Sequence, residues 1–173
     1  MNAMSPSIRK AALSAHIASS IGWFGAVAAF MALTVVGLYR VDAQQVRAAY
    51  IAMELIGWLA IVPLALVSLL TGVVSSVGTG WGLIRHYWVV VKLLSTALIT
   101  VLLLVHMQPV TLLANAAATQ GVIRMDLGGL KIQMLAYAAG TLIVLLALTA
   151  LSVYKPAGMT RYGWRKQFEE RAS

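Results

Sequence analysis

The pattern of hydrophobic and polar positions divides the chain into four long apolar stretches joined by shorter polar segments. The stretches cover residues 11–39, 48–77, 87–107 and 131–154. Each has roughly the 20 residues that a helix needs to cross the ~30 Å hydrocarbon core of a bilayer, or more. A spanning backbone must satisfy its own hydrogen bonds, and the alternating pattern of barrel strands does not occur. The sequence therefore predicts an all-α fold, an integral membrane four-helix bundle, with residues 1–173 forming a single transmembrane domain.

Polar and small residues mark the joints between these predicted helices. The first joint is 40–47 (RVDAQQVR), the second is the Gly/Ser-rich run 75–82, and the longer third joint is 108–131. We expect a short helix at about 112–120 inside the third joint. Pro63 has no amide hydrogen and its ring crowds the preceding turn, so it should kink the second helix near its middle.

The distribution of charge predicts how the helices are oriented in the membrane. The net charge is +8, and the N-terminus, the segment between the second and third predicted helices (with Arg85) and the tail 155–173 carry eight Lys and Arg residues, against four in the other two joints. By the positive-inside rule both termini should be cytoplasmic. We expect a multi-pass protein of the bacterial inner membrane. We expect the basic tail to rest on the anionic leaflet, with Trp164 and Phe168 among the headgroups.

Composition removes several classes of function. The Lys and Arg residues lie beside apolar spans instead of forming a basic stripe, so nucleic acid is not an expected partner. The chain has no cysteine, which excludes disulfides, thiolate metal sites and iron–sulfur clusters. A metal would need His, Met, carboxylate or Lys ligands, or a porphyrin. No nucleotide-binding loop, HExxH helix or GxSxG elbow occurs.

Four ionisable side chains fall inside the predicted spans, where such groups are rare and are candidates for function. They are His16, Glu54, Lys92 and His106. With a rise of about 1.5 Å per residue, His16 and Lys92 should lie at one depth near the cytoplasmic side. Glu54 and His106 should share a second depth near the opposite side. We expect all four to face the interior of the bundle.

Each of these residues also has a purely structural interpretation. His16 can hydrogen-bond to a serine or a carbonyl of a neighbouring helix, and Lys92 can extend its amine to the interface. His106 can itself lie at the interface, and Glu54 can form a structural pair with His106. Trp23, well inside the first span, either packs against another helix or lines a flat cofactor pocket.

Several of these residues together form a known pattern. His16 is followed on the same helix by Trp23-Phe24-Gly25, while Trp88 and Lys92 open the third helix and His106 closes it. This arrangement resembles the HemJ-type protoporphyrinogen oxidases and the related CopD-like membrane proteins. The resemblance implies that His16 is an axial ligand of haem b and that Lys92 also contacts the haem, on the iron or on a propionate.

The middle of the chain carries a second resemblance. Pro63 and the stretch TGVVSSVGTGWGLIRHYWVVVKL, residues 71–93, are similar to a family of uncharacterised bacterial predicted integral membrane proteins. Together the two resemblances cover the first three predicted helices.

The leading hypothesis is a haem b-binding membrane protein that is redox-active on a porphyrin or a quinone. His16 would bind the iron, Lys92 or His86 would provide the other contact, and Trp23 would line the pocket. Lys92 and Glu54 are the candidate catalytic groups. The expected partners are the lipid bilayer and a haem or porphyrin, with a homo-oligomer as an option.

Two alternatives belong to other classes of function. Met and imidazole ligands suit Cu(I), so the chain could handle copper at the outer end, where Met53, Glu54, His106 and Met107 could gather. The other alternative is a non-enzymatic membrane scaffold or subunit, in which the polar groups only hold the four helices together.

Overall fold

The computed structural model of the chain is almost entirely helical and describes residues 4–39, 42–78, 82–119 and 128–172. Its elements are α1 (Pro6–Tyr39), α2 (Ala43–Ile56), the π-helical turn η1 (Gly57–Ile61), α3 (Val62–Val77), α4 (Tyr87–Ala118), α5 (Gly128–Tyr154) and α6 (Arg161–Ala172). Four helical units are long and apolar enough to cross a membrane: α1, the continuous unit α2–η1–α3, α4 and α5. The predicted all-helical fold with four such helices is confirmed.

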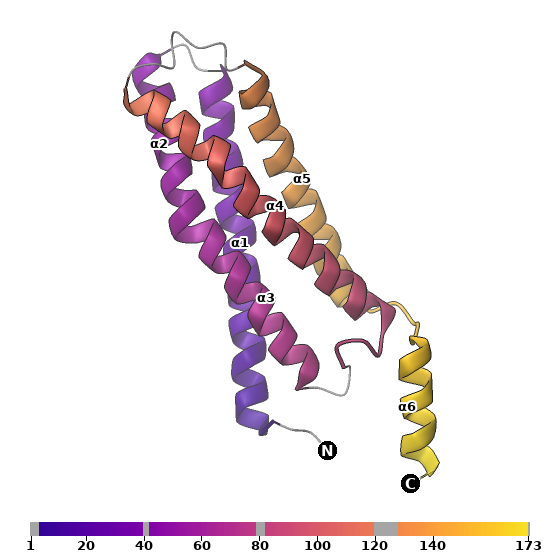
Figure 1. Cartoon of the computed structure of the whole chain (residues 1–173). Helices are drawn as coiled ribbons and strands as arrows, with labels where there is room; N and C mark the ends of the chain where they lie inside the picture. Colours follow the sequence, from indigo (N-terminus) through magenta and orange to yellow (C-terminus); the bar gives the residue numbers. More distant parts are fainter. Residues whose placement is uncertain (1–3, 40–41, 79–81, 120–127, 173) are drawn as a thin grey trace.

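The four long units lie side by side and form a bundle (Figure 1). α1 packs against α2, α3 and α5, and α4 closes the bundle by contacting α2, α3 and α5. The shared core includes Trp23, Tyr50, Met107 and Met134. Many large apolar side chains on the outer faces are exposed, as expected for helices whose surroundings are lipid. Both chain ends lie at the same end of the bundle (Figure 1).

Helix boundaries differ from the predicted ones at four places, one of which is the start of α5 at Gly128, three residues earlier than expected. α1 and α2 each begin five residues earlier than expected, at Pro6 and Ala43. The third helix was predicted to end at residue 107 and to be followed by a separate helix at 112–120, and this prediction is wrong. α4 continues without a break through Pro109 to Ala118. Its last turns bury Val110, Leu113 and Ala117, and this inward apolar face, packed on α2, explains why the helix continues.

Pro63 acts on the second helix through a widened turn. The five residues Gly57–Ile61 form a π-helical turn immediately before it, in which the Val62 amide donates to the Gly57 carbonyl. Proline cannot donate a backbone hydrogen bond and its ring crowds the carbonyl four residues earlier, and a π turn absorbs such a conflict. The extra residue shifts the helical register, so Trp58 is 46% exposed, while Ile61 and Ala65 are buried.

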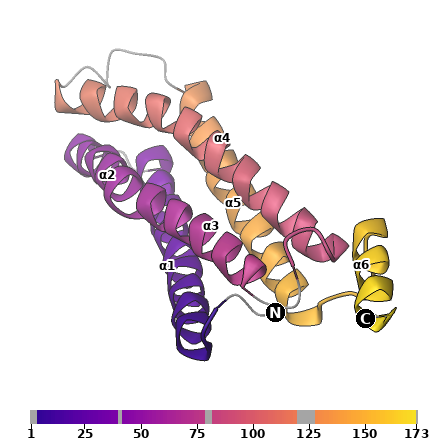
Figure 2. The same cartoon turned by 60° about the horizontal axis from the view of Figure 1, so that its bottom comes forward.

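The basic tail is also helical and is tied to the start of α4. The Thr160 hydroxyl donates to the Ile84 carbonyl over 2.6 Å, and the Thr160 amide donates to the Arg85 carbonyl over 3.0 Å. From there α6 extends away from the four long units (Figure 2). Trp164 and Phe168 lie one helical turn apart on α6, with ring centroids 6.2 Å apart, and both are exposed.

Candidate functional site

The imidazole of His16 is held against α3 by hydrogen bonds from one of its two nitrogens. Nδ1 lies 2.9 Å from the Ser68 carbonyl oxygen and 3.3 Å from the Thr71 hydroxyl oxygen. A carbonyl oxygen can only accept, so Nδ1 must carry the hydrogen. In the neutral ring Nε2 is then the nitrogen with a free lone pair, and it points away from α3.

Lys92 reaches this second nitrogen from the opposite side of the bundle. Its Nζ atom lies 3.4 Å from His16 Nε2 and donates to the Ser152 hydroxyl over 2.8 Å. Ser152 in turn donates to the Leu148 carbonyl over 2.8 Å. The prediction that His16 and Lys92 face one another at the same depth is confirmed, and the pair joins α1 and α4 to α3 and α5.

Small residues on α3 make room for the imidazole. A Cβ atom placed on Gly72 would lie 3.1 Å from His16 Cε1, closer than most side chains tolerate. One helical turn away, Ser20 and Ser68 share a hydrogen bond of 2.8 Å between their hydroxyl oxygens. Glycine and serine allow α1 and α3 to approach closely, which fixes the position from which His16 projects.

The His16–Lys92 pair borders a cavity of about 300 Å³, which we call the inner cavity. It lies between α1 and α3 on one side and α4 and α5 on the other. Its walls are formed by Leu13, His16, Ser68, Leu69, Gly72, Ser75, Ser76, Trp88, Val89, Lys92, Leu93, Thr96, Ser152 and Lys155. The cavity thus combines apolar walls with one imidazole and two amines.

The two other predicted cofactor residues lie outside the inner cavity. His86 precedes the first residue of α4 in an extended backbone conformation and forms a β-bridge with Met159. Trp23 is buried in the bundle core and borders a different cavity. The structure therefore brings His16 and Lys92 together, but it places neither His86 nor Trp23 beside them.

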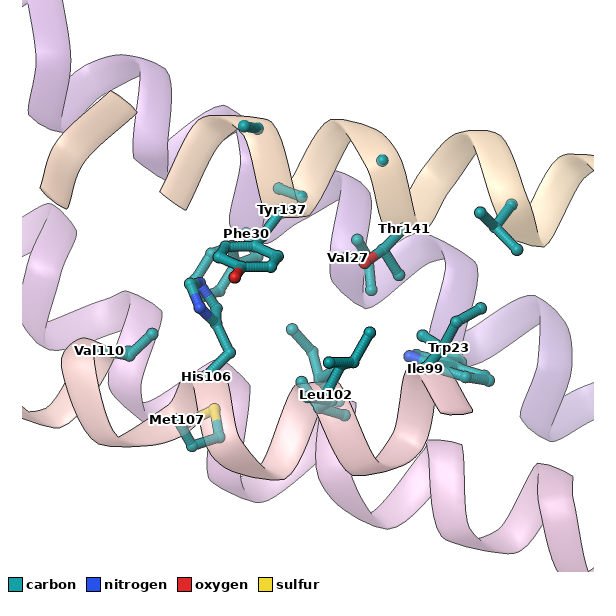
Figure 3. A pocket seen from close by; sticks show the side chains of 16 residues that line it. Trp23, Val27, Phe30, Ile99, Leu102, His106, Met107, Val110, Tyr137 and Thr141 are labelled. Carbon is teal, nitrogen blue, oxygen red and sulfur yellow. The ribbon is translucent and has the colours of Figure 1, made fainter. Parts of the chain in front are cut away.

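A second cavity, which we call the outer cavity, lies farther from the chain termini and has a volume of about 190 Å³. Trp23 and Phe30 of α1, His106 and Met107 of α4, and Tyr137 of α5 are among its lining residues (Figure 3). The His106 and Tyr137 rings are in contact, with centroids 4.1 Å apart. His106 thus faces the bundle interior, as predicted, and lines a mainly apolar space.

The four residues considered for copper do not share one cavity. His106 and Met107 border the outer cavity, whereas Met53 and Glu54 do not. The Met53 sulfur accepts a hydrogen bond from Thr34 at 3.9 Å. The Met107 side chain packs directly against Gly57. Within the described ranges, no three His, Asp or Glu side chains are grouped closely enough to hold a metal ion.

Sequence reasoning missed Ser68, Gly72 and Ser152 as parts of the site. The only signal for Ser68 and Ser152 was a hydroxyl inside an apolar span, and hydroxyl side chains are frequent in membrane helices because they can bond to their own backbone. Gly72 carries no polar group at all. Comparisons of the chain with protein-family models, curated proteins and solved structures found no match.

Proposed function

We propose that this chain is a multi-pass protein of the bacterial inner membrane, with both termini cytoplasmic, that binds haem b in the inner cavity through His16. Four apolar helices and the excess of Lys and Arg at the end of the bundle that holds the termini support the membrane part of the proposal. The haem part of the proposal is supported by the orientation of His16, whose Nδ1 is bonded to α3 and whose Nε2 faces Lys92.

The hydrogen bonding of His16 is the kind that metal-binding histidines make. A ligating imidazole commonly donates its other N–H to a carbonyl or carboxylate, which fixes the tautomer and the ring orientation. Here Nδ1 bonds to the Ser68 carbonyl over 2.9 Å, and Nε2 borders the inner cavity. A neutral imidazole in this state is a good ligand for haem iron.

The remaining walls of the inner cavity suit the other parts of a haem. Its volume of about 300 Å³ lies at the lower end of the ~300–1,000 Å³ that is typical of ligand pockets, so a haem would extend beyond it between the helices. Trp88, Val89 and Leu93 offer flat and aliphatic surface for the porphyrin ring. The amines of Lys92 and Lys155 offer positive charge for the propionates.

Lys92 would be the second contact of the haem. Its Nζ atom lies 3.4 Å from His16 Nε2, so both side chains could contact one haem, with Lys92 on the iron or on a propionate. Ser152 holds the amine on its other side, whether Lys92 binds the iron or a propionate.

A bound haem b would supply one-electron redox chemistry, and a porphyrin or a quinone would be its reaction partner. Within the protein, His16 would hold the iron, and the Lys92 amine would hold protons at Nζ beside it. The resemblance to HemJ-type oxidases in His16, Trp88 and Lys92 points to the same cofactor.

Optical spectroscopy of the detergent-purified protein tests this proposal. We expect a Soret band, in the protein as isolated or after haem is added, that is lost in His16→Ala. His106→Ala is the matched control, because it removes another half-buried histidine of the bundle and should keep the band. A band that survives His16→Ala unchanged, or a protein that binds no haem at all, would refute the proposal.

Lys92→Met separates the two roles considered for the amine. A changed absorption maximum at unchanged haem content would assign Lys92 to the iron. Reduced haem content with an unchanged maximum would assign it to a propionate.

A further inference from the structure

Two residues that line the outer cavity, Trp23 and His106, carry buried polar atoms that lack partners. Trp23 Nε1 and His106 Nε2 are both fully covered, and neither has a hydrogen-bond partner among the residues that the structure describes. The Trp23 side chain itself is only 1% exposed. Burial of such groups without a partner is unfavourable, above all in a membrane, where no water is available to form hydrogen bonds. These atoms therefore indicate a ligand that brings its own hydrogen-bonding groups.

The size and walls of the outer cavity limit what this ligand can be. An apolar cavity of about 150 Å³ is known to accept one benzene molecule, so 190 Å³ accommodates a single six-membered ring with small substituents. Among the residues that the structure describes, no Lys, Arg, Asp or Glu lines the cavity, which disfavours a charged ligand. A macrocycle such as haem would exceed this volume.

The cavity opens toward the surroundings of the bundle between α4 and α5. Leu102 of α4 and Tyr137 of α5 both line it and are 46% and 41% exposed on the bundle surface. In a bilayer this surface is covered by lipid, so a long apolar tail attached to the ring could leave through the opening. The ligand is therefore expected to be a lipid with a ring-shaped headgroup.

The two unpartnered atoms come from residues at different heights in the bundle. Trp23 lies seven residues after His16, and His106 lies fourteen residues after Lys92, on helices that run in the same direction (Figure 1). At about 1.5 Å per residue the two side chains start about 10 Å apart along the bundle. Figure 3 shows them at opposite ends of the cavity, with the indole nitrogen on the side facing it.

A para-quinone carries a carbonyl oxygen at each end of its ring and could accept one hydrogen bond from each of the two atoms. Its two carbonyl oxygens lie about 5 Å apart across the ring, as bond lengths dictate. A hydrogen bond of about 2.9 Å at each end extends the span to about 11 Å. We propose that the outer cavity binds the headgroup of an isoprenoid quinone, with Trp23 Nε1 donating to one carbonyl and His106 Nε2 to the other. This site does not depend on the haem proposed at His16.

Binding of decylubiquinone to the purified protein in lipid nanodiscs, measured by isothermal titration calorimetry, tests the site. We expect saturable binding at one site, weakened about tenfold or more by Trp23→Phe. Trp58→Phe is the matched control, because Trp58 is exposed and does not line the cavity, and it should bind like the wild type. His16→Ala should also bind like the wild type, which separates this test from that of haem binding.

A second variant and a second ligand keep the test decisive. Gly140 lines the cavity, and a Cβ atom there would meet no other atom within 4 Å. Gly140→Leu should therefore fill the space and block decylubiquinone without disturbing the fold. Decylbenzene has a ring and a tail but no carbonyls, and should bind at least tenfold more weakly. Equal binding of the two ligands, or equal affinity of Trp23→Phe and Trp58→Phe, would overturn the proposal.

Discussion

The orientation of one imidazole determines what the inner cavity can bind. Because the Ser68 carbonyl fixes the hydrogen on Nδ1, Nε2 is left to face Lys92 and the cavity. The hydroxyl of Thr71 lies 3.3 Å from the same Nδ1 atom, so the ring is held at one edge by α3. This arrangement depends on a residue without a side chain at position 72, since the ring lies directly against Gly72.

Gly72→Val should therefore displace His16 and lower haem binding. A Cβ there would lie 3.1 Å from the ring, and overpacking of this kind typically costs about 1–3 kcal/mol, which corresponds to about 5- to 150-fold in affinity. Gly25→Val is the matched control on α1, because a Cβ at Gly25 would meet nothing within 4 Å. Haem titration of both variants, followed by absorbance, checks the prediction. It fails if Gly72→Val binds haem as tightly as Gly25→Val.

At the residue scale, ionisable residues inside the spans were better guides to the candidate site than uncharged polar residues. His16 and Lys92 could be paired in advance because ionisable groups are rare in spans and their depths follow from simple counting. Ser152 could not be singled out, because it is one of many hydroxyl residues in apolar helices. Trp23 lines the outer cavity and not the inner one, which could not be predicted, since helical periodicity indicates its inward face but not which neighbouring helices surround it.

Among the elements, the π turn before Pro63 has the clearest consequence for the site. It adds one residue between α2 and α3 and so sets the direction in which Ser68 and Gly72 face. The sequence predicted a distortion at Pro63, but not its form, because both a kink and a π turn relieve the same conflict. The continuation of α4 through Pro109 was also missed, because a proline and a polar neighbour in sequence usually indicate a helix end.

The π turn accommodates one extra residue in the helix. Removing that residue together with the turn should therefore keep the faces of α2 and α3 aligned and leave the site intact. Deletion of Leu59, which is exposed, combined with Pro63→Ala, should restore a regular helix while keeping the faces of α2 and α3. Deletion of Leu66 instead should rotate one part of α3 by about 100° relative to the other and remove Ser68 and Gly72 from His16. Haem content and thermal unfolding of the two variants measure this. Similar haem loss in both deletions would contradict the role assigned to the π turn.

For the whole molecule, an even number of spanning units places both chain ends on one side of the bundle (Figure 1). The inner cavity lies toward that end and the outer cavity lies toward the other. With the proposed orientation, the haem site is near the cytoplasm and the quinone site is deeper in the membrane. The number of spans was predictable from apolar length alone, whereas the two cavities depend on how the helices pack.

The absence of cysteine allows this orientation to be tested with single-cysteine variants. Two of the variants, Ser7→Cys and Lys166→Cys, change residues toward the end that holds the termini. The other two, Gln45→Cys and Thr119→Cys, change residues toward the opposite end. All four positions are exposed. In bacterial spheroplasts, a membrane-impermeant maleimide should label positions 45 and 119 but reach positions 7 and 166 only after lysis. The reverse pattern would place the termini outside the cell.

The most direct test of the central claim is chemical rescue of His16→Gly. If Nε2 of this imidazole binds the haem iron, the variant should lose the Soret band of the wild type, and free imidazole should restore it by occupying the vacated space. Rescue by imidazole would separate iron ligation from a purely structural role for His16. A His16→Gly variant with the wild-type spectrum before any imidazole is added would show that His16 is not the iron ligand.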